Sequence, residues 1–470
     1  MASTSIPKPA SVRAYDPRAP HLLSFHDAAA KFATGADTPL AYWERCAARI
    51  AEREPSVQAF AHAMLDAART VAEAATRRYK DGRPLSPIDG LPIAVKDIFE
   101  TRDAPTAWGV AAFAKHPPFR DSAVVRALRA RGAAIAAKTH LPELGFGAPP
   151  ATCNPWDLAR SPGGSSSGSA ASVGAGMLPV AIGTQGRGSL TRPASYCGVY
   201  GYKPSHGAIH RGGDGGGQET NTHVGALAGS LADAWIVARQ LSEEAGPHPG
   251  SFGLEGPFDC PEARKPARLV RLEGPGWEQT DAGARAAYEA LLAALARAGI
   301  PVIDAAECPE TKALADDLKS ASVALADIAD YESRWPLVMY LQRAQELGQS
   351  VVSPSAVKKG LARADIPRER YHDALRFRSA FQAKLEACRR DGLLFISPSA
   401  TDAAPADRNS TGSSVYQWAS SVAGNPVVSL PFMVTDGLPY GLQVQGFRGR
   451  DAELIAHCRW LDEAFKRGAF

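Results

Sequence analysis

Between Arg160 and Ser189 the chain reads RSPGGSSSGSAASVGAGMLPVAIGTQGRGS. This stretch predicts a serine- and glycine-rich loop, a small-residue helix at 170–175, an apolar strand at 178–182, and a second glycine loop that ends at Ser189. Such an alternation of helix and buried strand is typical of a sheet covered by helices, in which functional groups gather at the strand ends. The stretch therefore predicts an α/β fold with its chemistry in the loops.

Two more apolar strands are predicted upstream, and both end in a lysine. Residues 91–95 lead into Lys96, and residues 133–137 lead into Lys138. A lysine acts as a base only when it is neutral, and burial in an apolar site lowers its pKa from about 10.4. Because most lysines at strand ends are solvated or paired, neither position indicates a catalytic base by itself.

Composition and charge exclude several classes of function. The 470 residues include 52 basic and 49 acidic side chains, so the formal charge is +3, which provides no electrostatic footprint for nucleic acid or an acidic membrane. The seven cysteines are scattered and form no Cys-x-x-Cys pair, which favours a reduced protein. No signal-peptide core and no apolar stretch of ~18 residues is visible. We expect a cytoplasmic protein with no nucleic-acid and no membrane partner.

Two serines stand in settings that suit nucleophilic chemistry. Ser165 follows two glycines in the first loop, and Ser189 ends the second loop. A serine hydroxyl is a poor nucleophile until a neighbouring base takes its proton. A serine that follows glycines lies beside exposed backbone N–H groups, which can stabilise an oxyanion. Taken singly, each loop is better explained as a flexible turn or an anion-holding helix N-terminus than as a catalytic loop.

Taken together, these motifs resemble the amidase signature family of serine hydrolases. The resemblance rests on the strand before Lys96, on the serine/glycine block, on GTQGRGSLTRPAS at 183–195 and on GVYGYKPS at 198–205. It continues in AGNP at 423–426 and in DGLPYGLQ at 436–443. It therefore covers most of the chain from about residue 40 onward, and the motifs occur in the family's order.

The resemblance implies a Lys–Ser–Ser triad without histidine or carboxylate. By motif position, Lys96 is the general base, Ser165 is the bridging serine after a cis peptide bond, and Ser189 is the nucleophile that forms an acyl-enzyme. The developing oxyanion would be held by the backbone N–H groups of Gly186, Arg187, Gly188 and Ser189. We expect an amidohydrolase that cleaves the C–N bond of a small amide, or a related carbamate, hydrazide or ester. Its second substrate is water, and no metal or organic cofactor is expected.

The resemblance also implies the domain organisation. We expect a single α/β/α domain over residues 1–470, with a central mixed sheet covered by helices on both faces, the amidase signature fold. Residues 1–80 form an N-terminal helical region, 85–230 the catalytic core, and 270–390 a helical, variable region around the substrate pocket. The glycine-rich segment at 212–217 is expected to be a mobile surface loop.

The sequence departs from the family pattern next to the nucleophile. Members commonly have Asp-Thr-Gly-Gly-Ser where this chain has QGRGS at 185–189. The side chain of Arg187 either points to solvent or enters the pocket, where it would favour an anionic or acceptor-rich substrate. Phe146 and Trp108 are further candidates for substrate contact, with ordinary core packing as the alternative.

Other interpretations of the same motifs are less favourable. GSSSG at 164–168 fits the nucleophile elbow of α/β-hydrolases, with Ser166 as the nucleophile of an esterase, but the proline-containing segment before it does not suit a central strand. The family also includes the A subunit of the glutamine-dependent aminoacyl-tRNA amidotransferase, which ranks second because the QGR run departs from it. His206 and His210 lie among glycines, so a helical metal pair is not expected. The sequence is compatible with a homodimer and does not fix the oligomeric state.

Overall fold

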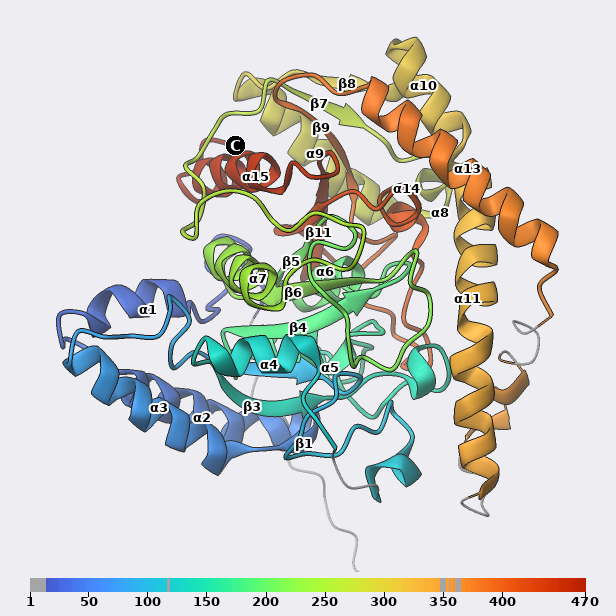
Figure 1. Cartoon of the computed structure of the whole chain (residues 1–470). Coiled ribbons are helices and arrows are strands. Elements are labelled where there is room, and N and C mark those ends of the chain that lie inside the picture. Colours follow the sequence, from blue (N-terminus) through green and yellow to red (C-terminus); the bar gives the residue numbers. More distant parts are fainter. Residues whose placement is uncertain (1–13, 116–118, 347–351, 355, 359, 361–364) are drawn as a thin grey trace, which may run out of the picture.

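The computed structural model describes residues 14–115, 119–346, 352–354, 356–358, 360 and 365–470 (Figure 1). One mixed sheet of eleven strands runs through the molecule in the order β1-β3-β2-β4-β6-β5-β10-β11-β9-β7-β8. The predicted α/β fold with a central mixed sheet is thereby confirmed. The strands are β1 (Phe60–Ala63), β2 (Pro92–Lys96), β3 (Ala134–Thr139), β4 (Val180–Gln185), β5 (Tyr200–Lys203), β6 (His223–Ala228), β7 (Arg268–Arg271), β8 (Val302–Asp304), β9 (Leu393–Pro398), β10 (Val427–Thr435) and β11 (Leu438–Gln445).

Helices cover the sheet on both sides. In Figure 1, α4, α7 and α15 pass in front of the strands and α5 and α6 lie behind them, while α11 stands along one side of the molecule. The α-helices are α1 (Phe25–Phe32), α2 (Pro39–Val57), α3 (Leu65–Lys80), α4 (Ala123–Ala130), α5 (Ser167–Gly174), α6 (Thr191–Cys197), α7 (Leu231–Ala245), α8 (Gly276–Gln279), α9 (Ala282–Arg297), α10 (Pro309–Asp316), α11 (Leu318–Glu346), α13 (Arg368–Ala387), α14 (Trp418–Ala423) and α15 (Asp451–Lys466).

The centre of the sheet determines where the chemistry lies. Strand β2 pairs in parallel with β3 on one side and with β4 on the other. All three strands are buried along their length, as expected for parallel strands with both faces covered. Because parallel strands end at the same edge, Lys96 at the end of β2 and Thr184 near the end of β4 meet there.

Helix α5 brings the first serine loop to that edge. Its residues are small, and Ser167 to Val173 are all buried, so the helix packs closely against β2, β3, β4 and β6. Helix α6 follows the second glycine loop in the same way and is buried over its whole length. The two loops therefore approach the end of β2 from one layer of helices.

The N-terminal region contains the expected helices and also a strand. Helix α2 ends where Gln58 adopts a left-handed conformation (φ 53°), and strand β1 follows before α3 begins. Strand β1 pairs antiparallel with β3 and forms one edge of the sheet. Four largely exposed residues carry almost no hydrophobic periodicity, which is why this strand was not predicted within the helical region.

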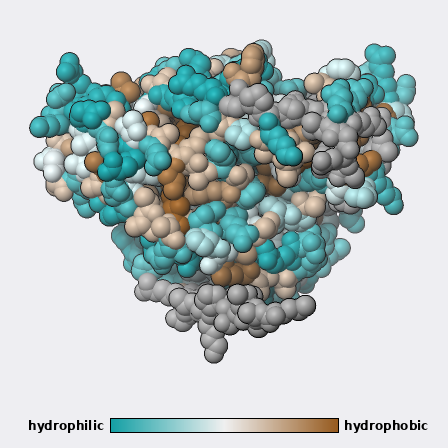
Figure 2. Space-filling model, turned by 90° about the horizontal axis from the view of Figure 1, so that it is seen from below, coloured by the Kyte–Doolittle hydropathy of each residue, from teal (hydrophilic) through white to brown (hydrophobic). Residues whose placement is uncertain are grey.

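The surface mixes polar and apolar side chains. Seen from below, hydrophilic residues dominate the outer parts of the face, and apolar ones gather near its middle (Figure 2). Among the residues that the structure describes, no helix has the length and apolar character needed to cross a bilayer.

Candidate active site

Lys96 is the last residue of β2 and is 2% exposed. Its Nζ lies 2.7 Å from Ser165 Oγ and 2.9 Å from Thr184 Oγ1. Burial lowers the pKa of Lys96 from 10.5 to about 7, and the negative charge of Asp214 opposes this shift. Both close partners of the amine are hydroxyls, which do not stabilise the ammonium form as a carboxylate would. The neutral amine is therefore well populated near neutral pH.

Ser165 follows a cis peptide bond between Gly164 and Ser165. The carbonyl oxygen of Gly164 accepts a hydrogen bond of 2.6 Å from the buried guanidinium of Arg192. Arg192 also donates to the carbonyl of Gly412 at 2.6 Å and to Thr411 Oγ1 at 3.2 Å. Arg192 thus ties the serine loop to the segment at 411–412, a role that the sequence motif alone did not suggest.

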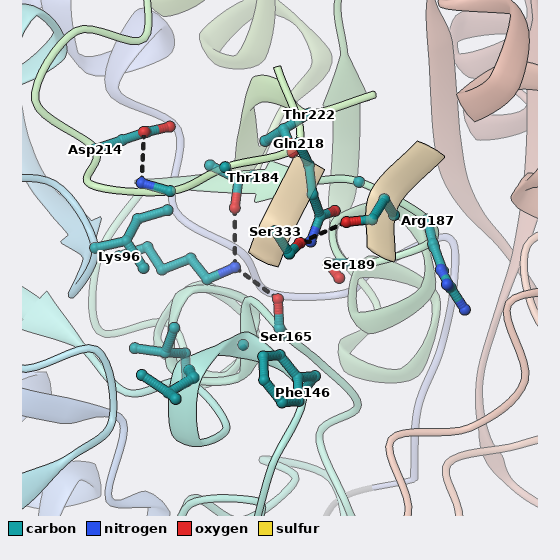
Figure 3. Close-up of a pocket in the computed structure, with 18 of the residues that line it drawn as sticks. Lys96, Phe146, Ser165, Thr184, Arg187, Ser189, Asp214, Gln218, Thr222 and Ser333 are labelled. Atoms are coloured by element: carbon teal, nitrogen blue, oxygen red, sulfur yellow. Dashed lines mark hydrogen bonds between the residues drawn. The ribbon is translucent and has the colours of Figure 1, made fainter. Parts of the chain in front are cut away.

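Ser189 lies in the turn between β4 and α6 and faces the same cavity as Lys96 and Ser165 (Figure 3). Over the described ranges of the chain, Ser189 Oγ has no hydrogen-bond partner, and Ser165 and Ser189 are not bonded to each other. Hydrogen bonds between catalytic groups are often long in ligand-free enzymes and tighten when substrate binds. The three residues predicted as a triad are therefore brought to one cavity, with the Lys96–Ser165 contact already formed.

The side chain of Gln185 holds the loop around Ser189 in place. Gln185 Oε1 accepts hydrogen bonds of 3.0 Å from the backbone N–H groups of both Leu190 and Thr191. From the other side, Ser421 Oγ donates to the carbonyl of Arg187 at 2.7 Å. The backbone N–H groups of residues 186–189 donate to no residue within the described part of the chain. They remain available to an oxyanion.

Arg187 follows neither of the two expected orientations completely. Its side chain is 39% exposed and forms an ion pair of 3.5 Å with Asp330 of α11. The residue lines the cavity, but Figure 3 shows the side chain turned away from Lys96. The pairing offsets much of the positive charge that would otherwise attract an anionic substrate.

The cavity has a volume of about 310 Å³ and an apolar wall. Trp108 and Phe146, the two aromatic candidates, both line it, and the ring of Trp108 lies 5.5 Å from that of Tyr340 on α11. Helix α11 comes from the region expected to shape the pocket. The apolar wall consists of Ile98, Trp108, Leu141, Leu144, Phe146, Ala329, Leu337 and Tyr340.

The glycine-rich segment at 212–217, expected to be a mobile surface loop, is irregular and leaves Gly215 exposed, while Gly216 and Gly217 also line the cavity. Tyr340 Oη donates a 2.9 Å hydrogen bond to the carbonyl of Gly215, whose φ is 61°. A Cβ at Gly215 would come within 2.8 Å of that hydroxyl. The segment is also anchored by a buried ion pair of 2.8 Å between Arg211 and Asp214. Glycine is needed here because the backbone packs directly on the aromatic wall.

The hydroxyl of the competing nucleophile Ser166 is used in hydrogen bonds to the backbone of β4. Its hydroxyl is fully buried, donates to the carbonyl of Thr184 and accepts from the N–H of Thr184, both at 3.2 Å. Ser166 does not line the cavity, and no strand leads into it. The strand–turn–helix context of a nucleophile elbow is therefore missing at this serine.

The two histidines do not form a metal pair. The Nε2 atom of His206 is 2.8 Å from the carbonyl of Glu219, and the backbone around His206 and His210 is not helical. No cluster of three or more histidine, cysteine or acidic side chains suitable for a metal occurs among the residues that the structure describes.

Proteins of similar sequence include amidases and an amidotransferase subunit. The sequence model of the Amidase family matches residues 41–455. The chain is 32% identical to the A subunit of the Glutamyl-tRNA(Gln) amidotransferase of Chloroflexus aurantiacus, over 93% of this chain and 95% of that protein. It is 39% identical to the putative amidase AmiB2 of Mycobacterium bovis, over 53% of this chain and 54% of that protein.

Two solved structures have the same fold over nearly their whole length. A crystal structure of an amidase superposes with a TM-score of 0.80 at 28% identity, covering 94% of this chain and 99% of the other. The peptide amidase of Stenotrophomonas maltophilia superposes with a TM-score of 0.76 at 25% identity, covering 93% of this chain and 96% of the other.

Proposed function

Since this chain belongs to the amidase signature family, we propose that it hydrolyses the C–N bond of a small amide by way of an acyl-enzyme on Ser189. The observation that carries this proposal is the buried amine of Lys96. It has a pKa of about 7, two hydroxyl partners, and a cavity shared with Ser165 and Ser189. A neutral amine beside a hydroxyl relay is what a serine nucleophile needs in place of histidine.

In the first half of the proposed reaction, the neutral amine of Lys96 takes the proton of Ser165, which takes the proton of Ser189. The Ser189 oxygen forms a bond to the amide carbon, and the carbonyl electrons move onto oxygen. The N–H groups of residues 186–189 stabilise this oxyanion. When the C–N bond breaks, the proton returns through Ser165 to the leaving nitrogen, which departs as an amine.

In the second half, water replaces the amine. The same relay takes a proton from the water as its oxygen attacks the acyl carbon of the Ser189 ester. Collapse of the second oxyanion breaks the ester bond, and the proton returns to Ser189. The products are a carboxylic acid and an amine, and Lys96 is again neutral. A carbamate, hydrazide or ester can enter the same sequence, because each presents a carbonyl with a leaving group.

The proposal is tested by labelling with a fluorophosphonate. We expect one covalent adduct, located on Ser189 by peptide mass spectrometry, that disappears in Ser189→Ala and persists in Ser166→Ala. Hydrolysis of a panel of aryl and alkyl amides by the purified chain should be lost with the adduct. An adduct on Ser166, or amide hydrolysis that survives Ser189→Ala, would contradict the assignment.

A second candidate function is that of an amidotransferase component. It is favoured by full-length relatives at 32% identity that carry this name. In that case the chain would release ammonia from glutamine for a second reaction and work with other proteins of the complex. The chain's QGR run departs from that subunit, and the rings of Trp108, Phe146 and Tyr340 in the cavity favour an amide with an apolar group over glutamine.

The two candidates separate in assays of the purified chain alone. If the chain is an amidase, it should hydrolyse aryl or alkyl amides without partner proteins, with a kcat/KM well above its value for glutamine. If the chain is an amidotransferase component, its kcat/KM for glutamine should exceed that for the other amides, and its activity should rise when the rest of the complex is added. Size-exclusion chromatography with light scattering of the same sample tests the homodimer.

The cofactor and compartment are also part of the proposal. The mechanism uses only side chains and water, so activity should persist after dialysis against EDTA. All seven cysteines are free thiols, which supports a reducing cytoplasmic setting. Loss of activity in EDTA that zinc restores would contradict the metal-free mechanism.

A further inference from the structure

Gln218 lines the same cavity as Lys96, Ser165 and Ser189, next to helix α11. It follows the glycine segment 212–217 and has a left-handed backbone conformation, with φ of 64°. Its carbonyl accepts hydrogen bonds from the N–H groups of Asn221 and Thr222, at 3.2 Å and 3.0 Å, and from Arg211 at 3.3 Å. The backbone of Gln218 is therefore held firmly in a conformation that residues with side chains rarely adopt.

The orientation of the Gln218 amide follows from its partner. Gln218 Nε2 donates to Ser333 Oγ at 2.8 Å, and Ser333 Oγ donates its own proton to the carbonyl of Ala329 at 2.5 Å. Because the single proton of Ser333 is used in this way, its oxygen can only accept from Gln218. The nitrogen of the amide must face Ser333, and Oε1 must face the other way.

Gln218 Oε1 lies next to the loop that holds the nucleophile. A Cβ at Gly186 would be 2.7 Å from this oxygen. The family pattern commonly has threonine where this chain has Gly186, so the missing side chain leaves the space that the Gln218 oxygen fills. No hydrogen-bond donor within the described part of the chain reaches Oε1. Figure 3 shows the side chain of Gln218 beside Ser333, with Ser189 below.

We propose that Gln218 is a specificity residue whose Oε1 accepts a hydrogen bond from an N–H group of the substrate. This inference rests on the proposed function and names its substrate class. The substrate is an amide that carries an N–H next to the scissile carbonyl, with an aromatic or branched aliphatic group against the wall of Trp108, Phe146 and Tyr340. Esters and fully N-substituted amides lack this donor and leave the Gln218 oxygen unpaired in the cavity.

The test compares an anilide with the ester of the same acid and a matching phenol. In Gln218→Met, which keeps the length of the side chain and removes the acceptor, we expect kcat/KM for the anilide to fall about tenfold. For the ester it should stay within about twofold, since no N–H is lost. Thr222→Val is the matched control. A Cβ at Gly186 would have Thr222 Oγ1 as its next neighbour after Gln218 Oε1, at 3.5 Å. The Thr222→Val variant should leave the anilide-to-ester ratio unchanged.

Ser333 is a positioning residue in this scheme. Ser333→Ala frees the Gln218 amide to rotate and should lower the anilide-to-ester ratio in the same direction as Gln218→Met, but less. Ser333→Thr keeps the hydroxyl and should restore the ratio. In the variant Gly186→Thr the new side chain displaces Oε1, so adding Gln218→Met to it should change the ratio no further.

The outcomes separate this inference from the proposed function. An anilide-to-ester ratio unchanged in Gln218→Met, or an equal loss for both substrates, would overturn the role of Gln218 while Ser189 stays the nucleophile. Turnover of neither substrate by the unmodified chain would instead contradict the proposed function. A lowered ratio in Gln218→Met together with an unchanged ratio in Thr222→Val is the result that supports the inference.

Discussion

Strands β2 and β3 run side by side in parallel, and each carries a buried lysine near its end. Lys138 Nζ lies 2.8 Å from a carboxylate oxygen of Asp97 and donates to the carbonyl of Pro105 and to Thr106 Oγ1. Lys96 has only the hydroxyls of Ser165 and Thr184 as close partners within the described part of the chain. The lysine of β3 is paired with Asp97 and holds the segment after β2, and the lysine of β2 is an amine that can give up its proton.

A third buried lysine shows that a lowered pKa does not define a base. Burial also lowers the pKa of Lys203 to about 7. Its Nζ donates to the backbone carbonyls of Asn425 and Ser420, and it does not line the cavity. Lys96 differs from Lys203 by its contact with a serine hydroxyl that faces the cavity. The role of a buried lysine therefore depends on its partners and its location as well as on its pKa.

The largest expected effect separates Lys96 from Lys138 by substitution. Lys96→Met should lower kcat for amide hydrolysis by about 10³- to 10⁴-fold, because the base is lost, while the fold is kept. Lys138→Met leaves Asp97 buried without its partner and should cost about 3–5 kcal/mol of the unfolding free energy. Steady-state kinetics and urea unfolding measure the two effects.

A double variant controls this result. Lys138→Met combined with Asp97→Leu removes both charges, so most of the lost stability should return. The folded fraction of each Lys138 variant should hydrolyse amides at close to the rate of the unmodified chain. A Lys96→Met variant with full activity would remove the distinction between the two lysines.

The next effect comes from giving Lys96 the partner that Lys138 has. In Thr184→Asp a carboxylate replaces the hydroxyl 2.9 Å from the amine, which should raise the pKa of Lys96 by about 1–3 units. The rate of the unmodified chain should rise with pH to a plateau above about 7, where the amine is neutral. In the variant the rate at pH 7 should fall about 10- to 100-fold and recover in alkaline buffer.

Thr184→Asn, which is of similar size and uncharged, is the matched control. Its pH profile should keep a midpoint near that of the unmodified chain. If both variants lose activity equally at every pH, the loss reflects altered packing and the charge of Lys96 is not what limits the rate.

A smaller effect concerns stability. The folded pKa of Lys96, about 7, lies below its ordinary value of 10.5, so between these pH values the unfolded chain binds more protons. The unfolding free energy should therefore rise with pH in this window, by at most about 1.4 kcal/mol per pH unit for this group. This contribution is complete above the unfolded pKa and is lost as the pH falls through about 7.

Urea unfolding at several pH values measures that slope. Lys96→Met should show a shallower rise than the unmodified chain, and the remaining rise belongs in part to Lys203. Ser189→Ala does not touch the amine and should keep the original slope. Equal slopes in all three proteins would mean that Lys96 keeps its ordinary pKa in the fold.

The smallest expected effect concerns Asp214, whose negative charge raises the pKa of Lys96. Asp214→Asn should move the acid limb of the rate profile to lower pH by less than about one unit, because burial affects this pKa more than Asp214 does. Glu219→Gln is the control, since Glu219 also pairs with Arg211, at 3.3 Å, but is largely exposed. Glu219→Gln should leave the acid limb of the rate profile at its original pH. A shift of that limb to higher pH in Asp214→Asn would contradict the effect of Asp214 on the pKa of Lys96.

Much of the fold follows from local sequence. The apolar runs at 91–95, 133–137 and 178–182 correspond to β2, β3 and β4, with ends that differ by a few residues. They were predictable because strands buried on both faces need continuous apolar side chains. Strand β1 was missed because it is short and mostly exposed, and β5 and β6 were not predicted as strands.

The residues proposed to carry the chemistry could be chosen from the linear chain, since the order and spacing of the motifs around Lys96, Ser165 and Ser189 need no coordinates. The physical difference between Lys96 and Lys138 could not, because both end an apolar strand. It arises in three dimensions, where Asp97 neutralises one lysine and a hydroxyl of a distant loop meets the other. Folding also brings Gln218 to a serine 115 residues further along. Local patterns encode burial and turns, whereas a lysine's pKa and an amide's orientation depend on groups distant in sequence.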